Sequence, residues 1–408
     1  MLNKNQEREL AYVVLIDGIE PIPGYDRVEH AIVGGWRIIV QKDQFKVGDP
    51  AIYFEIDSRV PSDKECFAFL EKRNYKVKTL KMCKTISQGL LMHPSDFGWE
   101  IHETSEGNVC IFDDEGVNHY ATGESRFLTK KLGIIYAEDE DNTRKAAPVD
   151  KYKKMAQRHS AIFKKPWARW MMRREWGRKV MFFFFGKKKD KKDGWPSWVS
   201  KTDEERVQNM PWILNDSDDW IATEKIDGTS TTFTMKRGKF GKKNFYVCSR
   251  NVCFGEETKP CYYDTNVYWE MAKKYDMYKI LDYLMTYTFP KDEWVTIQGE
   301  TYGAGIQKRD YSLEDHDFAA FNLITSGHGR YGTLEMRAYL EPKGIPCVPV
   351  LEESMKINQF ENVDAILAYA EGNSQLDGKP REGIVFRTLD GTKSFKAVSN
   401  SFLLKYHG

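Results

Sequence analysis

Short apolar runs separated by turn residues characterise the first hundred positions of the chain. They lie at residues 11–16, 36–40, 51–56, 75–80 and 89–92. Because they are short and rich in β-branched and aromatic residues, they indicate strands. Turn signals such as Gly34-Gly35 separate them at the spacing of a small all-β fold. We therefore predict a five-stranded OB-type β-barrel over residues 1–100, a fold that binds nucleic acid or supports a neighbouring domain.

The apolar pattern changes near Trp220, where strand-like runs begin to alternate with helical periodicity. Strands are expected at residues 221–226, 230–235, 245–248, 294–298, 318–324, 383–387 and 394–397, and a helix at 268–287. This order of elements predicts an α+β domain, which we place at residues 197–408. At 408 residues the chain is long enough for two or three domains, each with a core of its own.

The region between these domains, residues 101–196, is a connecting region or an insertion. It holds a polar, β-like stretch up to residue 122, a candidate helix at 150–157, a basic aromatic segment at 162–185 and a lysine-rich linker at 186–194. Within the aromatic segment, partly helical spacing relates Trp167, Trp170, Met171, Arg174 and Trp176. We favour a packing face for this stripe, with stacking on bases as the alternative.

The net charge of +1 conceals a basic block between residues 151 and 192. Sixteen lysines and arginines stand there against Glu175 and Asp190, so the block has an excess of 14 positive charges and the rest of the chain a net charge of −13. Such a density suits the phosphate backbone of nucleic acid, and we expect Arg173, Arg174 and Arg178 to contact it. A solvated charged helix and linker is the alternative.

The composition excludes several classes of protein. With 41% hydrophobic and 30% charged residues, the chain lies in the ordinary globular range. No apolar run approaches the roughly 18 residues of a membrane span, and the first eight residues lack a signal-peptide core. We expect an intracellular, cytoplasmic protein with no membrane partner. Seven cysteines without a C-x-x-C pair indicate free thiols rather than a disulfide framework or a zinc site.

The run Glu224-Lys225-Ile226-Asp227-Gly228 is the first candidate for chemistry. A lysine two residues before Asp-Gly is a weak signal alone, because it occurs by chance in roughly one chain in ten of this length. The context strengthens it, since Lys225 should emerge at a strand end while Gly228 permits a close backbone approach. Further candidates follow in and beside the later strands: Arg250, Glu300, Phe321, Glu382 and Lys396.

In this order, the elements resemble motifs I, Ia, III, IIIa, IV and V of the covalent nucleotidyltransferases, the superfamily of DNA ligases, RNA ligases and mRNA capping enzymes. Three further segments are similar to the RNA ligases with an N-terminal OB domain: residues 201–206, 304–307 and 394–405. The resemblance is close over residues 197–408, loose over 1–100 and absent over 125–195. It implies a C-terminal nucleotidyltransferase domain of ATP-grasp-like antiparallel sheets with flanking helices.

The chemistry of such a site needs these residue types. A lysine attacks phosphorus only as the neutral amine, so the site has to favour that form or bring in a metal that does, and we expect the positive charge of Lys396 to lower the pKa of Lys225. Glu382 and Asp227 offer hard oxygens for Mg²⁺ or Mn²⁺, partly through water. The resemblance further implies that Lys396 holds the α-phosphate of ATP while negative charge moves onto the leaving pyrophosphate.

The resemblance implies roles for three more residues. Glu300 contacts the ribose and the waters of the metal, Arg250 reaches the ribose or a phosphate, and Phe321 stacks on adenine. Taken singly, Phe321 also fits an ordinary core position, and Glu382 fits a turn or surface carboxylate. Some RNA ligases have a second lysine two residues after the first one of motif V, where this chain has Val398. Its role is absent here or is supplied elsewhere, with Lys393 and Lys405 as candidates.

The architecture separates the possible activities. DNA ligases and capping enzymes of the superfamily usually place an OB domain after motif V, whereas this sequence ends 12 residues after Lys396. We therefore expect a monomeric, ATP-dependent RNA ligase for RNA repair. It would form a lysyl-AMP at Lys225, transfer the AMP to an RNA 5′-phosphate and join that end to a 3′-OH. A capping guanylyltransferase that uses GTP and a non-catalytic RNA-binding protein remain as alternatives.

Overall fold

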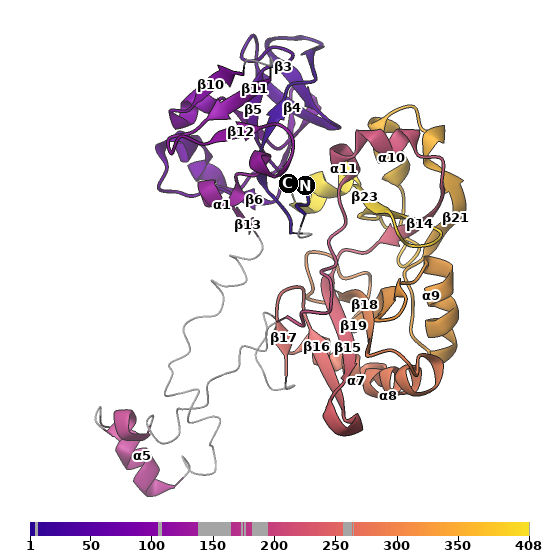
Figure 1. Ribbon diagram of the computed structural model, residues 1–408. Helices are drawn as coiled ribbons and strands as arrows, with labels where there is room; N and C mark the ends of the chain where they lie inside the picture. Colours follow the sequence, from indigo (N-terminus) through magenta and orange to yellow (C-terminus); the bar gives the residue numbers. More distant parts are fainter. Residues whose placement is uncertain are drawn as a thin grey trace.

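The computed structural model describes residues 1–4, 7–104, 108–137, 165–172, 174, 177–181, 195–255, 263 and 265–407. An N-terminal module runs from β1 to β13 and a C-terminal module from β14 onward, as Figure 1 shows. The expected helix at 150–157, the linker at 186–194 and Arg173 lie outside the described residues. No described helix is long and apolar enough to cross a membrane.

The N-terminal module consists of short antiparallel strands. They are β1 (Ala11–Leu15), β2 (Gly18–Ile22), β3 (Tyr25–Val33), β4 (Trp36–Gln41), β5 (Pro50–Phe54), β6 (Ser58–Arg59), β7 (Thr79–Met82), β8 (Thr85–Gln88), β9 (Leu90–Met92), β10 (Glu100–Glu103), β11 (Val109–Phe112), β12 (Asn118–Tyr120) and β13 (Ile135–Tyr136). The sheets are β1-β5-β9, β2-β3-β4 and β10-β11-β12, with the pairs β7-β8 and β13-β6. The helical segments are η1 (Glu65–Arg73), η2 (Pro94–Phe97), η3 (Glu124–Arg126), α1 (Thr129–Leu132) and, beyond the module, α5 (Pro166–Met172).

Strands β1 and β5 are central because they are buried on both faces. In β1, Val13 joins the core that contains Phe67, whereas Val14 joins the core that contains Trp36. Two-sided burial explains why both runs are continuously apolar instead of alternating. The first of these cores also contains Ile111, which lies beyond the boundary that we predicted at residue 100. The domain limits stay predictions.

The hairpin of β2 and β3 was not predicted as strands. Only its turn was recognised, and there Gly24 has a positive φ of 81°, a conformation that glycine adopts without strain. The flanking residues Glu20, Asp26 and Arg27 are exposed and charged, so they interrupt the apolar alternation that identifies a strand. The run at 75–80 also becomes a strand only from Thr79 onward.

Two antiparallel sheets build the C-terminal module. The four-stranded sheet has the order β21-β14-β22-β23, from β14 (Asp219–Lys225), β21 (Val350–Lys356), β22 (Gly383–Thr388) and β23 (Ser394–Val398). The six-stranded sheet has the order β17-β16-β15-β18-β19-β20, from β15 (Thr229–Arg237), β16 (Lys243–Cys248), β17 (Cys253–Phe254), β18 (Trp294–Gly303), β19 (His316–Thr325) and β20 (Gly329–Arg330). Each strand expected from residue 221 onward is therefore present.

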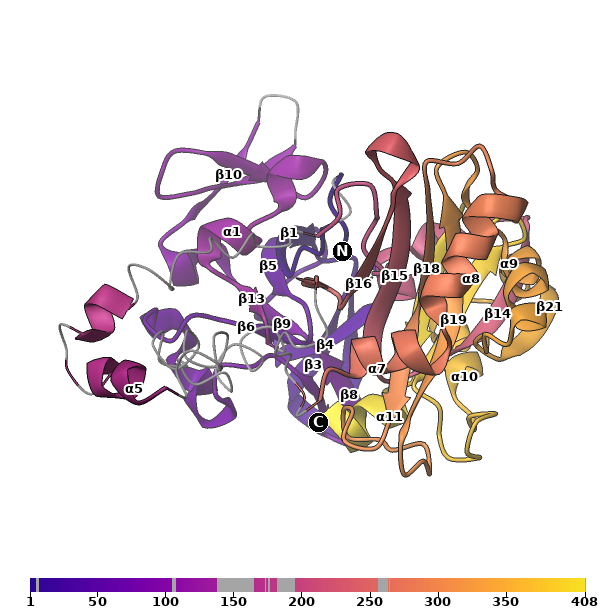
Figure 2. The same ribbon diagram turned by 90° about the horizontal axis from the view of Figure 1, so that it is seen from below.

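Helices cover the outer faces of these sheets (Figure 2). The helices are α7 (Val267–Lys274), α8 (Met277–Tyr283), α9 (Thr333–Leu340), α10 (Val363–Ala370) and α11 (Asn400–Phe402). Shorter turns are η4 (Val207–Asn209), η5 (Pro211–Asn215), η6 (Lys239–Gly241), η7 (Leu284–Thr288), η8 (Glu341–Lys343), η9 (Ile357–Gln359) and η10 (Leu403–His407). Residues of α7, α8 and α9 share one core with the six-stranded sheet, and α10 packs on the four-stranded sheet. The single helix expected at 268–287 is broken at Asp276, whose φ is 49°.

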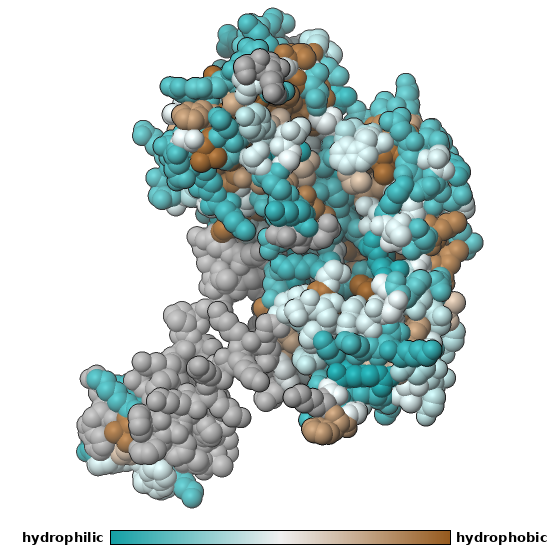
Figure 3. Space-filling view, in the orientation of Figure 1, coloured by the Kyte–Doolittle hydropathy of each residue, from teal (hydrophilic) through white to brown (hydrophobic). Residues whose placement is uncertain are grey.

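The two modules are joined by a packed interface. Val398 and Leu403 of the C-terminal module belong to the same buried core as Trp36 of the N-terminal module. The predicted turn at Gly34-Gly35 contacts η4, and a Cβ on Gly35 would lie 2.7 Å from the Cα of Gln208. Glycine is required there because no side chain fits. The surface in Figure 3 is mostly hydrophilic, with the hydrophobic residues scattered over it.

Candidate functional site

Lys225 lies where the chain crosses from one C-terminal sheet to the other. It is the last residue of β14, opposite Gly383 of β22, and β15 then begins at Thr229, opposite Thr301 of β18. Gly228 permits the crossing, because a Cβ there would lie 2.4 Å from the carbonyl oxygen of Thr301. The predictions of a strand end at Lys225 and of a close backbone approach at Gly228 are therefore confirmed.

Three carboxylates surround the amine of Lys225. Its Nζ atom donates hydrogen bonds to both carboxylate oxygens of Glu382, each at 2.7 Å. The charges of Glu300, on β18, and of Asp227, in the crossing, also act on Lys225. Asp227 is buried, and its backbone N–H donates a 2.7 Å hydrogen bond to the hydroxyl of Tyr311. Glu300 and Glu382, far away in the sequence, therefore meet Lys225 and Asp227 between the sheets.

The balance of charge around Lys225 differs from the one that we expected. Burial lowers its pKa, but the carboxylates of Glu382 and Glu300 outweigh burial and raise the pKa above the ordinary lysine value. The expectation that Lys396 leaves Lys225 with a lowered pKa is therefore wrong for the side chains of this chain alone. Acids lie closest to the amine, and they stabilise its charged form.

The same cluster of acids shifts Glu300. Burial raises the pKa of Glu300 to about 8, with Glu382 and Asp227 adding to the rise and Lys225 opposing it. Negative charge is thus in excess around the amine, which a bound cation would relieve. Within the described ranges, however, no group of three or more His, Cys, Asp or Glu side chains is arranged to hold a metal ion by itself.

A second buried lysine, Lys396, lies on β23 with only 8% of its surface exposed. Burial, as the largest cause, and the positive charges of Arg8 and Arg206 together lower the pKa of Lys396 to about 8, against the opposing charge of Asp203. The Nζ atom lies 3.8 Å from the carboxylate of Asp203. The backbone N–H of Lys396 donates a 2.7 Å hydrogen bond to the carbonyl of Glu205, so the segment 203–206 runs beside β23.

Arg250 follows β16 and faces the same segment. Its guanidinium forms an ion pair with Asp203 and lies over the ring of Tyr136, 4.8 Å from the ring centroid. Burial opposes the charge of Arg250, but Asp203 outweighs burial and raises its pKa. Arg250 and Lys396 therefore share one carboxylate, and the structure brings both to the same side of the site.

Phe321 lies on a bulge of β19. Its neighbours Ala320 and Asn322 pair with Gly299 and Gln298 of β18, so Phe321 is the extra residue between them. Its half-buried ring packs against a small apolar cluster that includes Ile226, the residue after Lys225. Phe321 is thus close to the crossing, as expected for a residue of this site.

The three arginines predicted to contact nucleic acid are only partly described. The guanidinium of Arg174 lies 3.7 Å from the ring centroid of Trp170, and Arg178 is half-buried. Half of the surface of Trp167 and of Trp170 is exposed, which does not favour the packing face that we preferred. No described contact joins these arginines to the group around Lys225.

Val398 shows why a second lysine is absent from β23. Val398 is 2% exposed and packs in the core of the N-terminal module, where a lysine would lose its solvation. Lys393, one suggested substitute, is paired with Asp216 and Asp218 at 2.6 and 2.7 Å. The other, Lys405, lies over the ring of Tyr406. The structure brings neither of them to Lys225.

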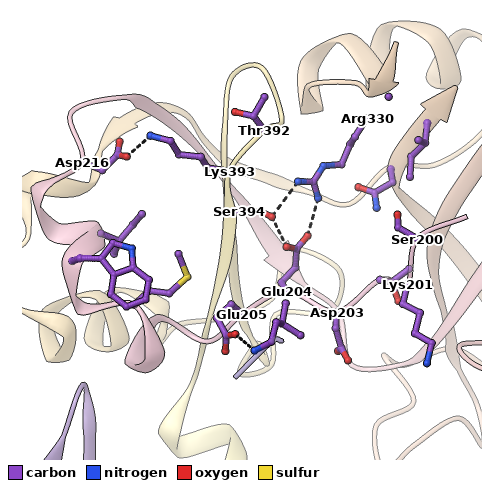
Figure 4. A pocket seen from close by; sticks show the side chains of 18 of the residues that line it. Ser200, Lys201, Asp203, Glu204, Glu205, Asp216, Arg330, Thr392, Lys393 and Ser394 are labelled. Carbon is purple, nitrogen blue, oxygen red and sulfur yellow. Dashed lines mark hydrogen bonds and ion pairs between the residues drawn. The ribbon is translucent and has the colours of Figure 1, made fainter. Parts of the chain in front are cut away.

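A polar cleft of about 940 Å³ borders the site along the segment 200–205. Figure 4 shows Glu204 at its centre, where this buried carboxylate pairs with Arg330 at 3.4 Å and accepts a hydrogen bond from Ser394. Asp203 lines the same cleft, whereas Lys225 does not. The segment therefore connects the two places: Asp203 lines the cleft and also contacts Arg250 and Lys396, whereas Glu204 pairs with Arg330 inside the cleft.

The sequence did not identify every residue of the site. Asp203 and Arg206 lie in the segment 201–206, which we noted only for its resemblance, and Tyr136 lies in a region that we could not assign. No short-range signal marks them, because each contributes through contacts with distant elements. Among the cysteines, Cys66, Cys83, Cys110 and Cys347 are free thiols as predicted, and Cys261 lies outside the described residues.

Models of known families match both modules. The RNA ligase family model matches residues 218–407, and a model of an OB-fold domain matches residues 10–94. The predicted fold class, an OB-type module followed by a nucleotidyltransferase domain of the α+β class, is confirmed. No curated protein sequence matches the chain.

Solved structures of an RNA ligase from Naegleria gruberi match nearly the whole chain. A mutant with ATP and Mn is 25% identical with a TM-score of 0.70, and the match covers 98% of this chain and 100% of that one. A mutant with AMP and Mn is 25% identical with a TM-score of 0.69, covering 98% and 99%. The enzyme with PPi is 25% identical with a TM-score of 0.68, also covering 98% and 99%.

Proposed function

Because the chain belongs to the ATP-dependent RNA ligases of the covalent nucleotidyltransferase superfamily, in the branch with an N-terminal OB-fold domain, we propose that Lys225 is the residue that carries AMP. The position of its Nζ atom is the observation that carries this proposal. The amine lies between the two sheets, within 2.7 Å of Glu382, and the charges of Glu300 and Asp227 act on it. Lys396 lies near enough for the charge of Lys225 to lower its pKa.

The reaction proceeds in three steps. First, the neutral Nζ of Lys225 attacks the α-phosphorus of ATP, so that a P–N bond forms while the bond to pyrophosphate breaks. Second, an oxygen of an RNA 5′-phosphate attacks the phosphorus of the lysyl-AMP, and Lys225 leaves as the amine. Third, a 3′-OH attacks the 5′-phosphate of the RNA-adenylate, which forms the phosphodiester bond and releases AMP.

Lys225 must lose a proton before the first step, and the surrounding acids oppose that loss. The carboxylates of Glu382, Asp227 and Glu300 would hold Mg²⁺ or Mn²⁺, together with water and the phosphates of ATP. Such shared coordination fits a site whose described side chains do not hold an ion alone. The bound cation would neutralise the acids and the phosphates, and would thereby favour the neutral amine.

The remaining residues bind the nucleotide. Lys396 faces the α-phosphate and stabilises the charge that develops there as pyrophosphate leaves. Glu300 contacts the ribose and the waters of the metal, Arg250 contacts the ribose or a phosphate, and Phe321 stacks on adenine beside Ile226. What supports these roles is the convergence of the four residues on one crossing between two sheets.

On the RNA side, we propose that the enzyme acts as a monomer on nicked or broken RNA strands during RNA repair. The N-terminal OB-fold domain and the basic arginines Arg173, Arg174 and Arg178 would contact the phosphate backbone. Charge reversal at these arginines should weaken binding to nicked RNA and reduce its salt dependence, while labelling of Lys225 by ATP stays intact. Unchanged affinity across a salt titration would remove the arginines from the interface. An intracellular location stays a prediction.

Incubation of the whole chain with α-labelled ATP or GTP tests the proposal. We expect a covalent label from ATP that is released by pyrophosphate and transferred to a 5′-phosphorylated RNA. Sealing of a nicked RNA duplex should follow, with a 3′-deoxy strand as the control that blocks only the third step. Labelling by GTP alone would instead indicate a capping guanylyltransferase. RNA binding without any label would indicate a non-catalytic protein.

A further inference from the structure

Tyr136 extends the N-terminal module toward the nucleotide site. It ends β13, opposite Ser58 of β6, and Leu132 and Ile134 just before it are anchored in the core of the module. Its ring lies beneath two guanidinium groups, with the Cζ atoms of Arg8 and Arg250 at 5.2 and 4.8 Å from the ring centroid. A guanidinium within about 6 Å of an aromatic face is attracted to it.

Arg250 reaches this ring from the C-terminal module. Tyr136 holds the face of its guanidinium, and Asp203 holds its edge through an ion pair. The Asp203 carboxylate in turn lies 3.8 Å from the Nζ of Lys396. An arginine side chain has many rotamers, so two fixed contacts remove most of the ordering that binding would otherwise require. Arg250 is therefore pre-organised by one residue from each module.

We infer that Tyr136 is a positioning residue, which holds Arg250 in the orientation that the nucleotide needs. The nucleotide site of the C-terminal module is then completed by a residue of the N-terminal module that does not itself touch the nucleotide. This inference rests on the proposed function, in which Arg250 binds the ribose or a phosphate of ATP. Its consequence is that the N-terminal module takes part in the first step of the reaction, before any RNA is bound.

A purely structural role for Tyr136 in joining the modules is less consistent with the interface. Other contacts already join them: Asn209 accepts hydrogen bonds from the Tyr12 hydroxyl at 3.1 Å and from Trp36 at 2.6 Å, and Gln88 donates to Asn400 at 2.9 Å. Val398 and Leu403 add a buried apolar contact. Arg8, the other guanidinium at the ring, keeps its ion pair with Glu55 at 3.3 Å. Removing the Tyr136 ring should therefore leave the modules joined and should free mainly Arg250.

The test measures the rate of Lys225 labelling over a range of ATP concentrations in the full chain. We expect Tyr136→Leu to raise the KM for ATP about tenfold with a smaller change in kcat. The reason is that loss of a partly buried cation–π contact typically weakens an interaction by about this factor. Tyr136→Phe keeps the ring and loses only the hydroxyl, which also hydrogen-bonds to Arg250, so its KM should rise less, by about threefold. Tyr120→Leu, which changes a half-buried tyrosine at a strand end of the same module, serves as the matched control and should change neither constant.

A double-mutant cycle with Arg250→Ala separates the two proposals. If Tyr136 acts through Arg250, the double variant should be no worse than Arg250→Ala alone. Two results would overturn the inference about Tyr136. One is a double variant whose rise in KM is the product of the two single effects, and the other is a normal KM in Tyr136→Leu while Arg250→Ala has a raised KM. A normal KM in Arg250→Ala itself would remove the proposed role of Arg250. Thermal unfolding of each variant identifies any general loss of structure. If Tyr136→Leu is unfolded, the folded Tyr136→Phe decides: a raised KM that disappears in the background of Arg250→Ala supports the inference, and an unchanged KM overturns it.

Discussion

Lys225 and Lys396 are two largely buried lysines of one site, yet their pKa values move in opposite directions. Burial lowers the pKa of each. Around Lys225 the nearest charges are Glu382 and Glu300, which raise its pKa, whereas the arginines around Lys396 help burial to lower its pKa to about 8. Residue type is the same and burial acts on both in the same direction, so the neighbouring charges make the difference.

This difference fits the two tasks that we assign to the lysines. The nucleophile must become neutral, and the acids keep it charged until positive charge enters the site. The phosphate-binding lysine must be charged, and a bound anion would raise its lowered pKa and hold the charged form more firmly. A nucleotide that binds with a divalent cation would shift the pKa of both lysines in the direction that the reaction needs. The cation would oppose the acids and lower the pKa of Lys225, and the phosphates would oppose the arginines and raise the pKa of Lys396.

The largest effect is expected from Lys225→Ala. The variant should lose the covalent AMP adduct completely, a fall of at least about 10⁴-fold in labelling rate, because the attacking amine is removed. The chain should stay folded, but its thermal midpoint should fall by several degrees, since Glu382 loses its partner in a largely buried ion pair. Denaturing gel electrophoresis after incubation with labelled ATP measures the adduct. An adduct that persists in this variant would place the nucleophile elsewhere.

Removal of Lys396 should have the next largest effect. Lys396→Ala should lower kcat for labelling by about 10² to 10³-fold, the usual loss when one donor to a developing charge is removed. Lys225 stays in place, so the residual label should still reside on it, which peptide mapping can determine. If instead KM rises and kcat is unchanged, Lys396 only binds ATP and the contrast between the two lysines is smaller than we propose.

A smaller effect concerns pH. In the proposed reaction Lys225 must be neutral and Lys396 charged, and the pKa of Lys225 lies above that of Lys396, which is about 8. The value of kcat/KM for labelling should therefore rise about tenfold per pH unit up to about pH 8, as Lys225 loses its proton, and level off above it, where Lys396 loses its charge. Arginine stays charged over this range. In Lys396→Arg the rise should therefore continue above pH 8, even though the rate at pH 7 is lower. A profile that still levels off near pH 8 in this variant would assign that titration to another group.

The sequence predicted the parts of this site that follow from local pattern. Lys225 and Gly228 were recognisable at a strand end, and the spacing of Glu300, Glu382 and Lys396 added the distant members. The sign of the pKa shift at Lys225 was wrong, because it depends on which charges lie closest in space. Sequence order gives no such distances.

The parts that the sequence missed are contacts between segments that lie far apart in the chain. Tyr136 reaches Arg250 only because β13 pairs with β6, and Asp203 reaches Lys396 only because its segment runs beside β23. Neither has a periodic or compositional signal. Val398 is the opposite case: its position was recognised as unusual, but only the buried core of the N-terminal module explains it.

Val398→Lys gives the smallest expected change in catalysis and sharpens the contrast between the lysines. It places a second lysine on the strand of Lys396, two residues on, where some RNA ligases have one. Here the new ammonium would enter an apolar core, so we expect a fall of about 4 °C or more in the thermal midpoint. Labelling of Lys225 below that temperature should stay within about threefold, and Val398→Met is the control for size. A clear gain in labelling would mean that the strand can turn this position toward ATP, and that the interface is looser than its packing indicates.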